Sequence, residues 1–280
     1  MLFIPVGDNL GEMYKNNDLE SLTTVINKEN TITSKIRFLN NITASNSDIE
    51  NKTIEETVLL NMFKRACDIS YSIYEIHTSH IGSSMQLLRS LYEIGVLIRI
   101  LSESTEDDLS LFRELGHRIS DSAIMEEYDL YNLNKGAEFY DLKLKYRDRG
   151  TPRDKTMYKS YDWAKPFFSE RELKRLNTSY SPSFRDLVFK SGVTDSMWKN
   201  NISVYEDASS IIHYSGITQK VIDNQTSAAI NTHLSVFIRA IVIDYLIVVE
   251  NLCHSIEKDN YRKLETFAKK MRLLITKDWE

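Results

Sequence analysis

Apolar side chains recur every three or four residues along most of the chain, and this spacing predicts helices. The clearest stripe begins near Thr53 and comprises Val58, Leu59, Met62, Phe63, Ala66, Ile69, Ile73 and Ile76. Residues 85–101 and 228–256 are apolar on nearly every side, which is typical of helices covered by neighbours all round. We expect these two to be the central members of an all-α bundle of roughly six to eight helices.

Weaker periodicity predicts the remaining helices. Ser104 or Thr105 is suited to cap a third helix that extends to about Tyr146. Further helices are predicted over 184–189, 195–221 and 260–275. The 280 residues include 9 Gly and 4 Pro, too few for the many turns of an all-β fold.

The composition changes at two places and divides the chain. Residues 18–39 are weakly helical and polar, and residues 40–51 are rich in Asn and Ser and indicate a linker. We therefore predict an accessory helical segment over 1–50 and the main bundle over 51–280. Within the bundle, residues 146–182 hold three of the four prolines and form an insertion.

The insertion is the most basic part of the chain, with nine Lys or Arg against five Asp or Glu. Its cations are interleaved with aromatic residues, and this mixture suits single-stranded nucleic acid, since cations bind phosphates and rings stack on bases. The candidate nucleic-acid-binding residues are Arg147, Arg149, Arg153, Lys155, Trp163 and Lys165. The alternative is a solvated loop whose aromatic side chains pack on the bundle or on a second subunit.

Charge and cysteine content narrow the class of protein. The net charge of −5 argues against a generally basic surface that would bind nucleic acid or membrane everywhere. The apolar run 236–249 is interrupted by Arg239 and Asp244, so we expect it to be a core helix and not a membrane span. We therefore expect no membrane partner, and we expect the protein to be cytoplasmic. Cys67 and Cys253 read as buried thiols.

Neither a metal nor a cofactor is expected from the sequence. The glycine-rich phosphate loops of nucleotide-binding proteins are absent. A di-iron bundle needs two Glu-x-x-His pairs, and one occurs, at Glu114 and His117. His77 and His80 stand near Gly82, where we expect a helix break, so they are interpreted as loop or cap residues.

Two helix faces hold the candidate catalytic residues. Arg89 and Glu93 share one face of an otherwise apolar helix, where buried charges need partners. Tyr205, Ser209 and His213 share a face of another helix. If the two faces pack together, His213 could carry a proton, Arg89 could stabilise an anion and Glu93 could orient either group. The alternative is a satisfied polar network that fixes helix register.

The order of these motifs resembles a known protein family. Arg-Ser-Leu-Tyr-Glu at 89–93, followed by Trp198, Tyr205, Ser210 and His213, is similar to a family of bacterial all-helical domains of unknown function, over roughly residues 55–255. The resemblance implies a helical bundle with an Arg/Glu/His polar centre.

A looser resemblance is to the HEPN superfamily of helical bundles, which includes toxin and antiviral ribonucleases that act at a dimer interface. Their hallmark is an Arg followed, after four to six residues, by a His. In this chain three residues separate Arg113 from His117, which is one fewer than the hallmark requires. Both side chains still share one helix face. The alternative is a solvated pair on an amphipathic helix.

Two functions remain open at this point, and the sequence does not settle whether the protein is an enzyme. The first is a defence- or toxin-associated, metal-independent ribonuclease-like effector with Arg89, Glu93, Tyr205 and His213 at its centre and RNA as partner. The second is a helical scaffold or sensor for a partner protein, encoded nearby, or for a small ligand. Self-association into a homo-oligomer is expected under either.

Overall fold

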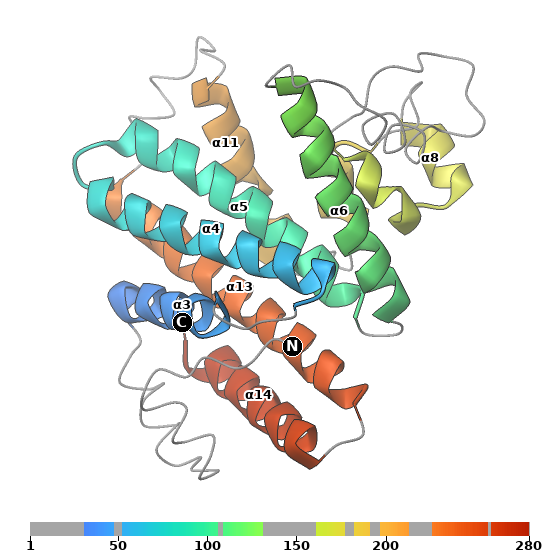
Figure 1. Ribbon diagram of the computed structural model, residues 1–280. Coiled ribbons are helices and arrows are strands. Elements are labelled where there is room, and N and C mark those ends of the chain that lie inside the picture. Colours follow the sequence, from blue (N-terminus) through green and yellow to red (C-terminus); the bar gives the residue numbers. More distant parts are fainter. Residues whose placement is uncertain are drawn as a thin grey trace.

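The computed structural model describes residues 31–47, 52–105, 109–130, 161–176, 182–190, 197–212, 226–256 and 259–279. The regular structure within these ranges is helical and includes no strand. The prediction of an all-α, bundle-like fold is therefore confirmed. Figure 1 shows long helices stacked side by side, with shorter helices around one end.

A helical hairpin forms the centre of the described fold. Helix α4 (Ile54–Ile76) begins at a capping box in which the Thr53 hydroxyl accepts from the Glu56 amide and the Glu56 carboxylate accepts from the Thr53 amide. His77 is the C-cap of α4, and His80 is the N-cap of α5 (Ile81–Glu103). The interpretation of both histidines as cap residues is confirmed.

The C-terminal half of the bundle packs on this hairpin. Helix α13 (Ser227–His254) lies against α5 and α4, and α14 (Asp259–Asp278) lies against α13. Helix α3 (Ile32–Ser47) covers α4 and α13. The core between these helices is closely packed, and Leu88, Phe237 and Ile241 are fully buried in it.

Helix α6 and several shorter elements surround the other side of the hairpin. Helix α6 packs on α4, the 3-10 helix η1 on α6, and α9, α10 and α11 on α5. Their bounds are Leu109–Leu130 for α6, Asp162–Phe167 for η1, Glu170–Leu176 for α8, Phe184–Lys190 for α9, Met197–Asn200 for α10 and Ile202–Ile212 for α11. Helix α5 thus has neighbours on several sides, as its apolar sequence predicts.

One boundary prediction was wrong. The expected linker over 40–51 is helical as far as Ser47, because Leu39 and Ile42 are fully buried against the bundle and this packing outweighs the low helix propensity of Asn and Ser. The hydroxyls of Ser104 and Thr105 donate to carbonyls at the end of α5. Residues 106–108, which separate them from α6, lie outside the described residues, so the predicted cap of that helix stays a prediction.

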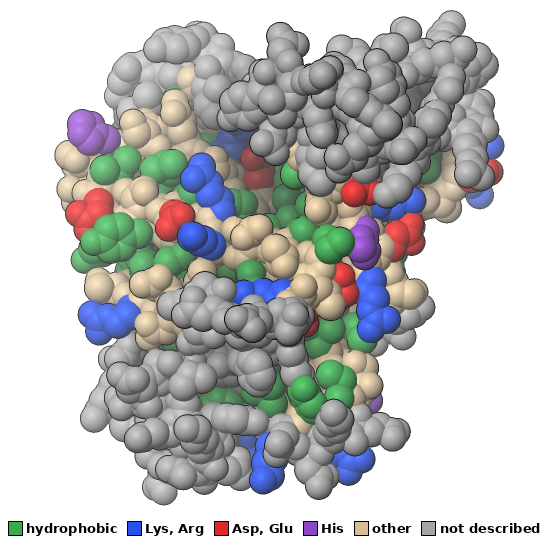
Figure 2. Space-filling view, viewed as in Figure 1, with side chains coloured by type: hydrophobic (Ala, Val, Ile, Leu, Met, Phe, Trp, Pro, Cys, Tyr) green, Lys and Arg blue, Asp and Glu red, His purple; other side chains and the backbone are tan. Residues whose placement is uncertain are grey.

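The surface and the thiols agree with the sequence pattern. On the face shown in Figure 2, basic and acidic side chains of the described residues are intermixed. Cys67 and Cys253 are buried, and burial raises the pKa of each thiol, to about 11 and about 12. No helix in the described ranges has the length and hydropathy to cross a bilayer.

Candidate functional site

The two predicted faces do meet, at an Arg–Tyr–Glu cluster on α5 and α11. Arg89 Nη2 donates to Glu93 Oε1 at 3.0 Å and to the Tyr205 hydroxyl at 3.3 Å. The guanidinium carbon of Arg89 also lies 4.9 Å from the centroid of the Tyr205 ring, within cation–π range. The side chains of Arg89 and Glu93 are 25% and 27% exposed, so the cluster reaches solvent.

One donor of this cluster is left over. Arg89 Nε is buried and donates to no acceptor among the described residues. A guanidinium presents five N–H groups in a planar fork that matches a carboxylate or phosphate. The Arg89 side chain is 25% exposed, so an anion from solvent can reach the exposed part of its guanidinium beside Glu93 and Tyr205, although not the buried Nε.

Burial sets the protonation of the cluster. Burial raises the pKa of Glu93, more than the Arg89 charge and a Tyr205 hydrogen bond lower it. For Arg89, burial lowers the pKa, but the Tyr205 hydrogen bond and the Glu93 charge outweigh it, and the pKa is raised. The cluster thus combines a permanent cation with a carboxyl group that holds its proton more firmly than usual.

Tyr92 fixes α11 in the position that the cluster needs. It is fully buried, and its ring lies 5.9 Å from Tyr205, 5.6 Å from Trp198 and 6.0 Å from Phe184, between ring centroids. Its hydroxyl donates to the Trp198 carbonyl. The tyrosine of the Arg-Ser-Leu-Tyr-Glu motif is thus the centre of the aromatic packing behind Tyr205.

A second buried ionic cluster lies beside this packing. Arg99 Nη1 lies 3.1 Å from Asp244 Oδ1, and the Trp198 indole N–H donates to Asp244 Oδ2 at 3.4 Å. Arg99 also pairs with Glu103. Burial raises the pKa of Asp244 to about 6, against the lowering effect of Arg99 and Trp198. Asp244 is 4% exposed, so this cluster is structural support for α5 and α13 and not a solvent-facing site.

The described part of the insertion adjoins the Arg89 cluster. Tyr161, at the start of η1, lies 5.9 Å from Phe184, and Phe184 lies 4.7 Å from Tyr205, between ring centroids. Trp163 is 3% exposed, so for this residue the structure favours the alternative in which the insertion's rings pack on the bundle. Lys165 is partly buried. Arg147, Arg149, Arg153 and Lys155 lie outside the described residues.

Other candidate residues are placed differently or are not described. His213 lies outside the described residues, one position beyond the end of α11. The Ser209 hydroxyl donates at 2.6 Å to the Tyr205 carbonyl of its own helix. Arg113 and His117 are exposed on α6, and Arg113 lies 3.7 Å from Glu55 in the first turn of α4, so they do not join the Arg89 cluster.

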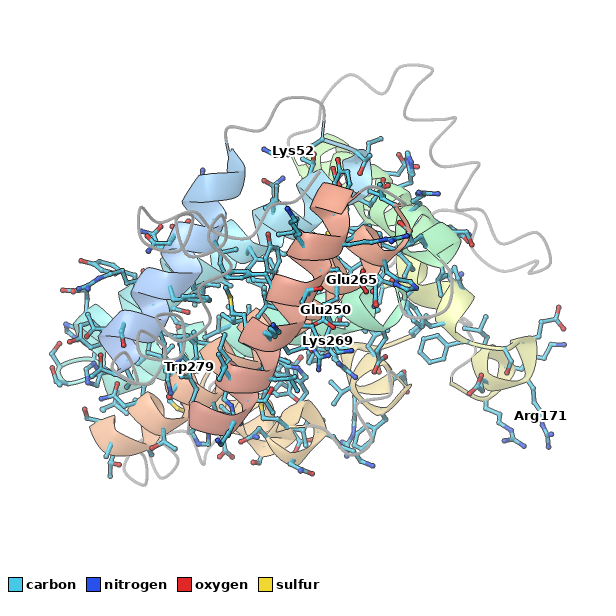
Figure 3. All side chains as sticks on the ribbon, turned by 90° about the horizontal axis from the view of Figure 1, so that it is seen from below. Lys52, Arg171, Glu250, Glu265, Lys269 and Trp279 are labelled. Carbon is cyan, nitrogen blue, oxygen red and sulfur yellow. The ribbon has the colours of Figure 1, made fainter. Side chains whose placement is uncertain are left out.

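An open groove of about 810 Å³ lies on the outer face of α14, away from Arg89. Its cations include Lys269, and His254 there pairs with Glu265 at 3.1 Å. Figure 3 shows Glu265 and Lys269 on α14, and Arg171 of α8 pointing away from the bundle. Among the described residues, no group of three or more His, Cys, Asp or Glu is placed to hold a metal ion.

Comparison of the chain with protein-family models, with curated proteins and with solved structures found no match.

Sequence reasoning missed the residues that support the cluster. Asp244 and Arg99 carry opposite charges and each lies in an otherwise apolar helix. Since a buried charge needs a partner, this pattern could have indicated that the two form a buried ion pair. Gly95 interrupts the same apolar helix, and a Cβ there would lie 1.9 Å from the Trp198 indole. A glycine in a helix predicted to be central is a signal of close packing, but the sequence does not name the partner.

Proposed function

We propose that this protein is a metal-independent ribonuclease-like effector that binds a phosphate of single-stranded RNA at Arg89. The observation that supports this best is the partly exposed Arg89 guanidinium, held by Tyr205 and Glu93 with its Nε left without an acceptor among the described residues. A cation fixed in advance, in a site of low dielectric, stabilises developing negative charge more strongly than a mobile one.

In the proposed reaction, the ribose 2′-oxygen attacks the adjacent phosphorus and its proton passes to His213. Arg89 stabilises the charge that develops on the phosphoryl oxygens. The bond from phosphorus to the 5′-oxygen breaks, and that oxygen takes the proton of the Tyr205 hydroxyl, which His213 restores through solvent. The products are a 2′,3′-cyclic phosphate end and a 5′-hydroxyl end.

The geometry of Tyr205 supports its role as proton donor. Its oxygen accepts from Arg89, and its own proton is shared with the Glu93 carboxylate, whose pKa this hydrogen bond lowers. Glu93 orients Arg89 through the 3.0 Å ion pair.

The test is cleavage of labelled single-stranded RNA in EDTA by the native protein and by Arg89→Ala, Tyr205→Phe and His213→Ala. We expect each variant to lose roughly 100-fold or more in rate. Arg118→Ala is the matched control, because Arg118 forms an exposed i,i+4 pair with Glu114 at 2.9 Å that resembles the Arg89–Glu93 pair. Intact RNA with the native protein, or equal cleavage by all variants, would refute the proposal.

A second candidate function, a non-catalytic scaffold or sensor, is favoured by a different observation. Arg89, Glu93 and Tyr205 largely satisfy one another and join α5 to α11, as a network that fixes register would. The double variant Arg89→Glu/Glu93→Arg separates the two functions. A structural pair tolerates the exchange and keeps its melting temperature within a few degrees, whereas a phosphate site loses cleavage because the cation has moved.

A further inference from the structure

An exposed aromatic side chain stands at the end of α9. Phe189 is 40% exposed, although a phenylalanine is stabilised by burial. In the described ranges, the other large aromatic side chain with comparable exposure is Tyr71, at 58%. An exposed ring of this size is a feature that binding surfaces use.

Two cations flank the Phe189 ring. The Arg185 guanidinium carbon, one turn earlier on α9, lies 5.7 Å from the ring centroid. Lys199 Nζ, on α10, lies 5.5 Å from it. The Arg185 side chain is 68% exposed, so an incoming anion can reach it in competition with Glu206. The surface thus offers an exposed ring with two positive charges lying over it.

The helix that carries Phe189 also packs against the Arg89 cluster through the buried ring of Phe184. Phe184, which contacts Tyr205, precedes Phe189 by five residues, or about 7.5 Å along the helix axis. Arg185 Nη1 also lies 3.3 Å from the carboxylate of Glu206, the neighbour of Tyr205 on α11. A strand lying across α9 could therefore reach both Phe189 and Arg89.

We propose that Phe189, Arg185 and Lys199 form a stacking platform for single-stranded nucleic acid, with one base on the ring and the adjoining phosphates on the two cations. The inference rests on the proposed function, since it supplies the surface that leads a strand to Arg89. Glu206 opposes the strand, because its carboxylate occupies Arg185 and repels phosphate. Base stacking on protein rings with flanking cations is the usual chemistry of sequence-tolerant strand binding.

Tyr71 provides the internal control. It is more exposed than Phe189, but its helix neighbours one turn away are Asp68 and Glu75, so its surroundings are acidic. An exposed ring alone would make both positions equivalent. The platform predicts that Phe189 binds a strand and Tyr71 does not.

The experiment measures fluorescence anisotropy of labelled oligouridine and oligodeoxythymidine of about 12 nucleotides with the full chain and its variants. Deoxythymidine lacks the 2′-hydroxyl, so it reports binding without the proposed cleavage. Phe189→Ala is expected to weaken binding about fivefold to a hundredfold, and Tyr71→Ala less than about twofold. Phe189→Leu keeps an apolar side chain without a stacking face and is expected to weaken binding as Phe189→Ala does.

The cations and Glu206 give an independent readout. Arg185→Gln and Lys199→Gln should each reduce the slope of log affinity against log salt by about 0.7, the value for one lost phosphate contact on a single strand. Glu206→Gln should tighten binding several-fold, because it frees Arg185 and removes a repelling charge. Thermal unfolding of each variant verifies that it is folded.

The outcomes separate this inference from the proposed function. Binding that depends on Phe189 without any cleavage supports the platform and refutes the ribonuclease. Cleavage that depends on Arg89 but is indifferent to Phe189 does the reverse. Equal weakening of binding by Phe189→Ala and Tyr71→Ala would overturn the platform. Full binding by Phe189→Leu would also overturn it, and would indicate that Phe189 makes an apolar contact with a protein instead. Weakening confined to oligouridine supports the platform and makes it specific for RNA.

Discussion

The absence of a side chain at position 95 lets a tryptophan ring lie directly on a central helix. Gly95 is buried on α5, and a Cβ built there would meet three atoms of the Trp198 indole at 1.9–2.6 Å. Trp198 in turn donates to Asp244 and accepts from Tyr92. The ring therefore cannot withdraw without breaking its hydrogen bond to Asp244, and Tyr92 holds the backbone that carries it.

Gly95→Ala is expected to destabilise the protein by about 1–3 kcal/mol, although alanine is the better helix former, because the indole must shift away from its hydrogen bond to Asp244. Ser83→Ala, at an exposed position of the same helix, is the control. Urea unfolding measures both. A Gly95→Ala protein as stable as the native one would show that the indole has room to move.

At the scale of single elements, α3 is attached to the bundle through a buried amine. Lys35 is 1% exposed, and its Nζ donates to Ser235 of α13 at 2.8 Å and lies 5.5 Å from the Trp279 ring. Burial, together with the Arg239 charge, lowers the pKa of Lys35 to about 8. The charged ammonium form of Lys35 is therefore less favourable in the folded protein than in the unfolded chain, and this lowers the free energy of unfolding.

Because the folded pKa of Lys35 lies below its ordinary 10.5, the unfolded chain binds more protons between pH 8 and 10.5. The cost is full below pH 8 and is relieved as pH rises through that range. The free energy of unfolding of the native protein, relative to Lys35→Met, is thus expected to rise by at most about 3 kcal/mol between those pH values. Denaturant unfolding measures it. Lys277→Met, at an exposed lysine of α14, is the control, and a curve of the same shape there would contradict the explanation.

Helices could be predicted from the sequence where a single apolar stripe at helical spacing marked them. The apolar residues from Val58 to Ile76 defined α4, and the i,i+4 spacing gave the Arg89–Glu93 pair. Helix α3 was missed after Asn40 because Asn and Ser read locally as linker residues. Its stability comes from Leu39 and Ile42 packing on distant helices, which local propensity does not contain.

The scale of the whole molecule is where sequence reasoning reached its limit. The Arg89–Tyr205 contact joins residues 116 positions apart and the Arg99–Asp244 pair joins residues 145 apart. Helix periodicity gives the face of each residue but not which faces meet. The Arg89–Tyr205 contact was predicted only for the case that the two helix faces pack together. The Arg99–Asp244 pair was not predicted, because a single sequence does not show which helices are neighbours.

The end of α14 closes the bundle against α3. Trp279 is 1% exposed and packs edge-on against Phe38, with ring centroids 5.4 Å apart. Figure 3 shows it at the end of α14 on the side of α3. One ring near the C-terminal end thus covers both Phe38 and the Lys35 amine.

Trp279→Ala is expected to cost about 3–5 kcal/mol, the usual range for a buried tryptophan, and to lower the urea midpoint accordingly. Leu273→Ala, 54% exposed on the same helix, should change stability by less than about 0.5 kcal/mol. Equal losses at the two positions would mean that the Trp279 contact with α3 does not stabilise the fold.

The burial of the tryptophans also makes the protein its own optical probe. All three of its tryptophans, Trp163, Trp198 and Trp279, are 3% exposed or less and lie in the insertion, beside the Arg89 cluster and against α3. Shielded indoles emit at shorter wavelengths than hydrated ones and are poorly reached by collisional quenchers. Replacing two of the three by phenylalanine would leave a single fluorescent tryptophan. Its emission wavelength would report whether its own region has unfolded while the regions of the other two remain folded.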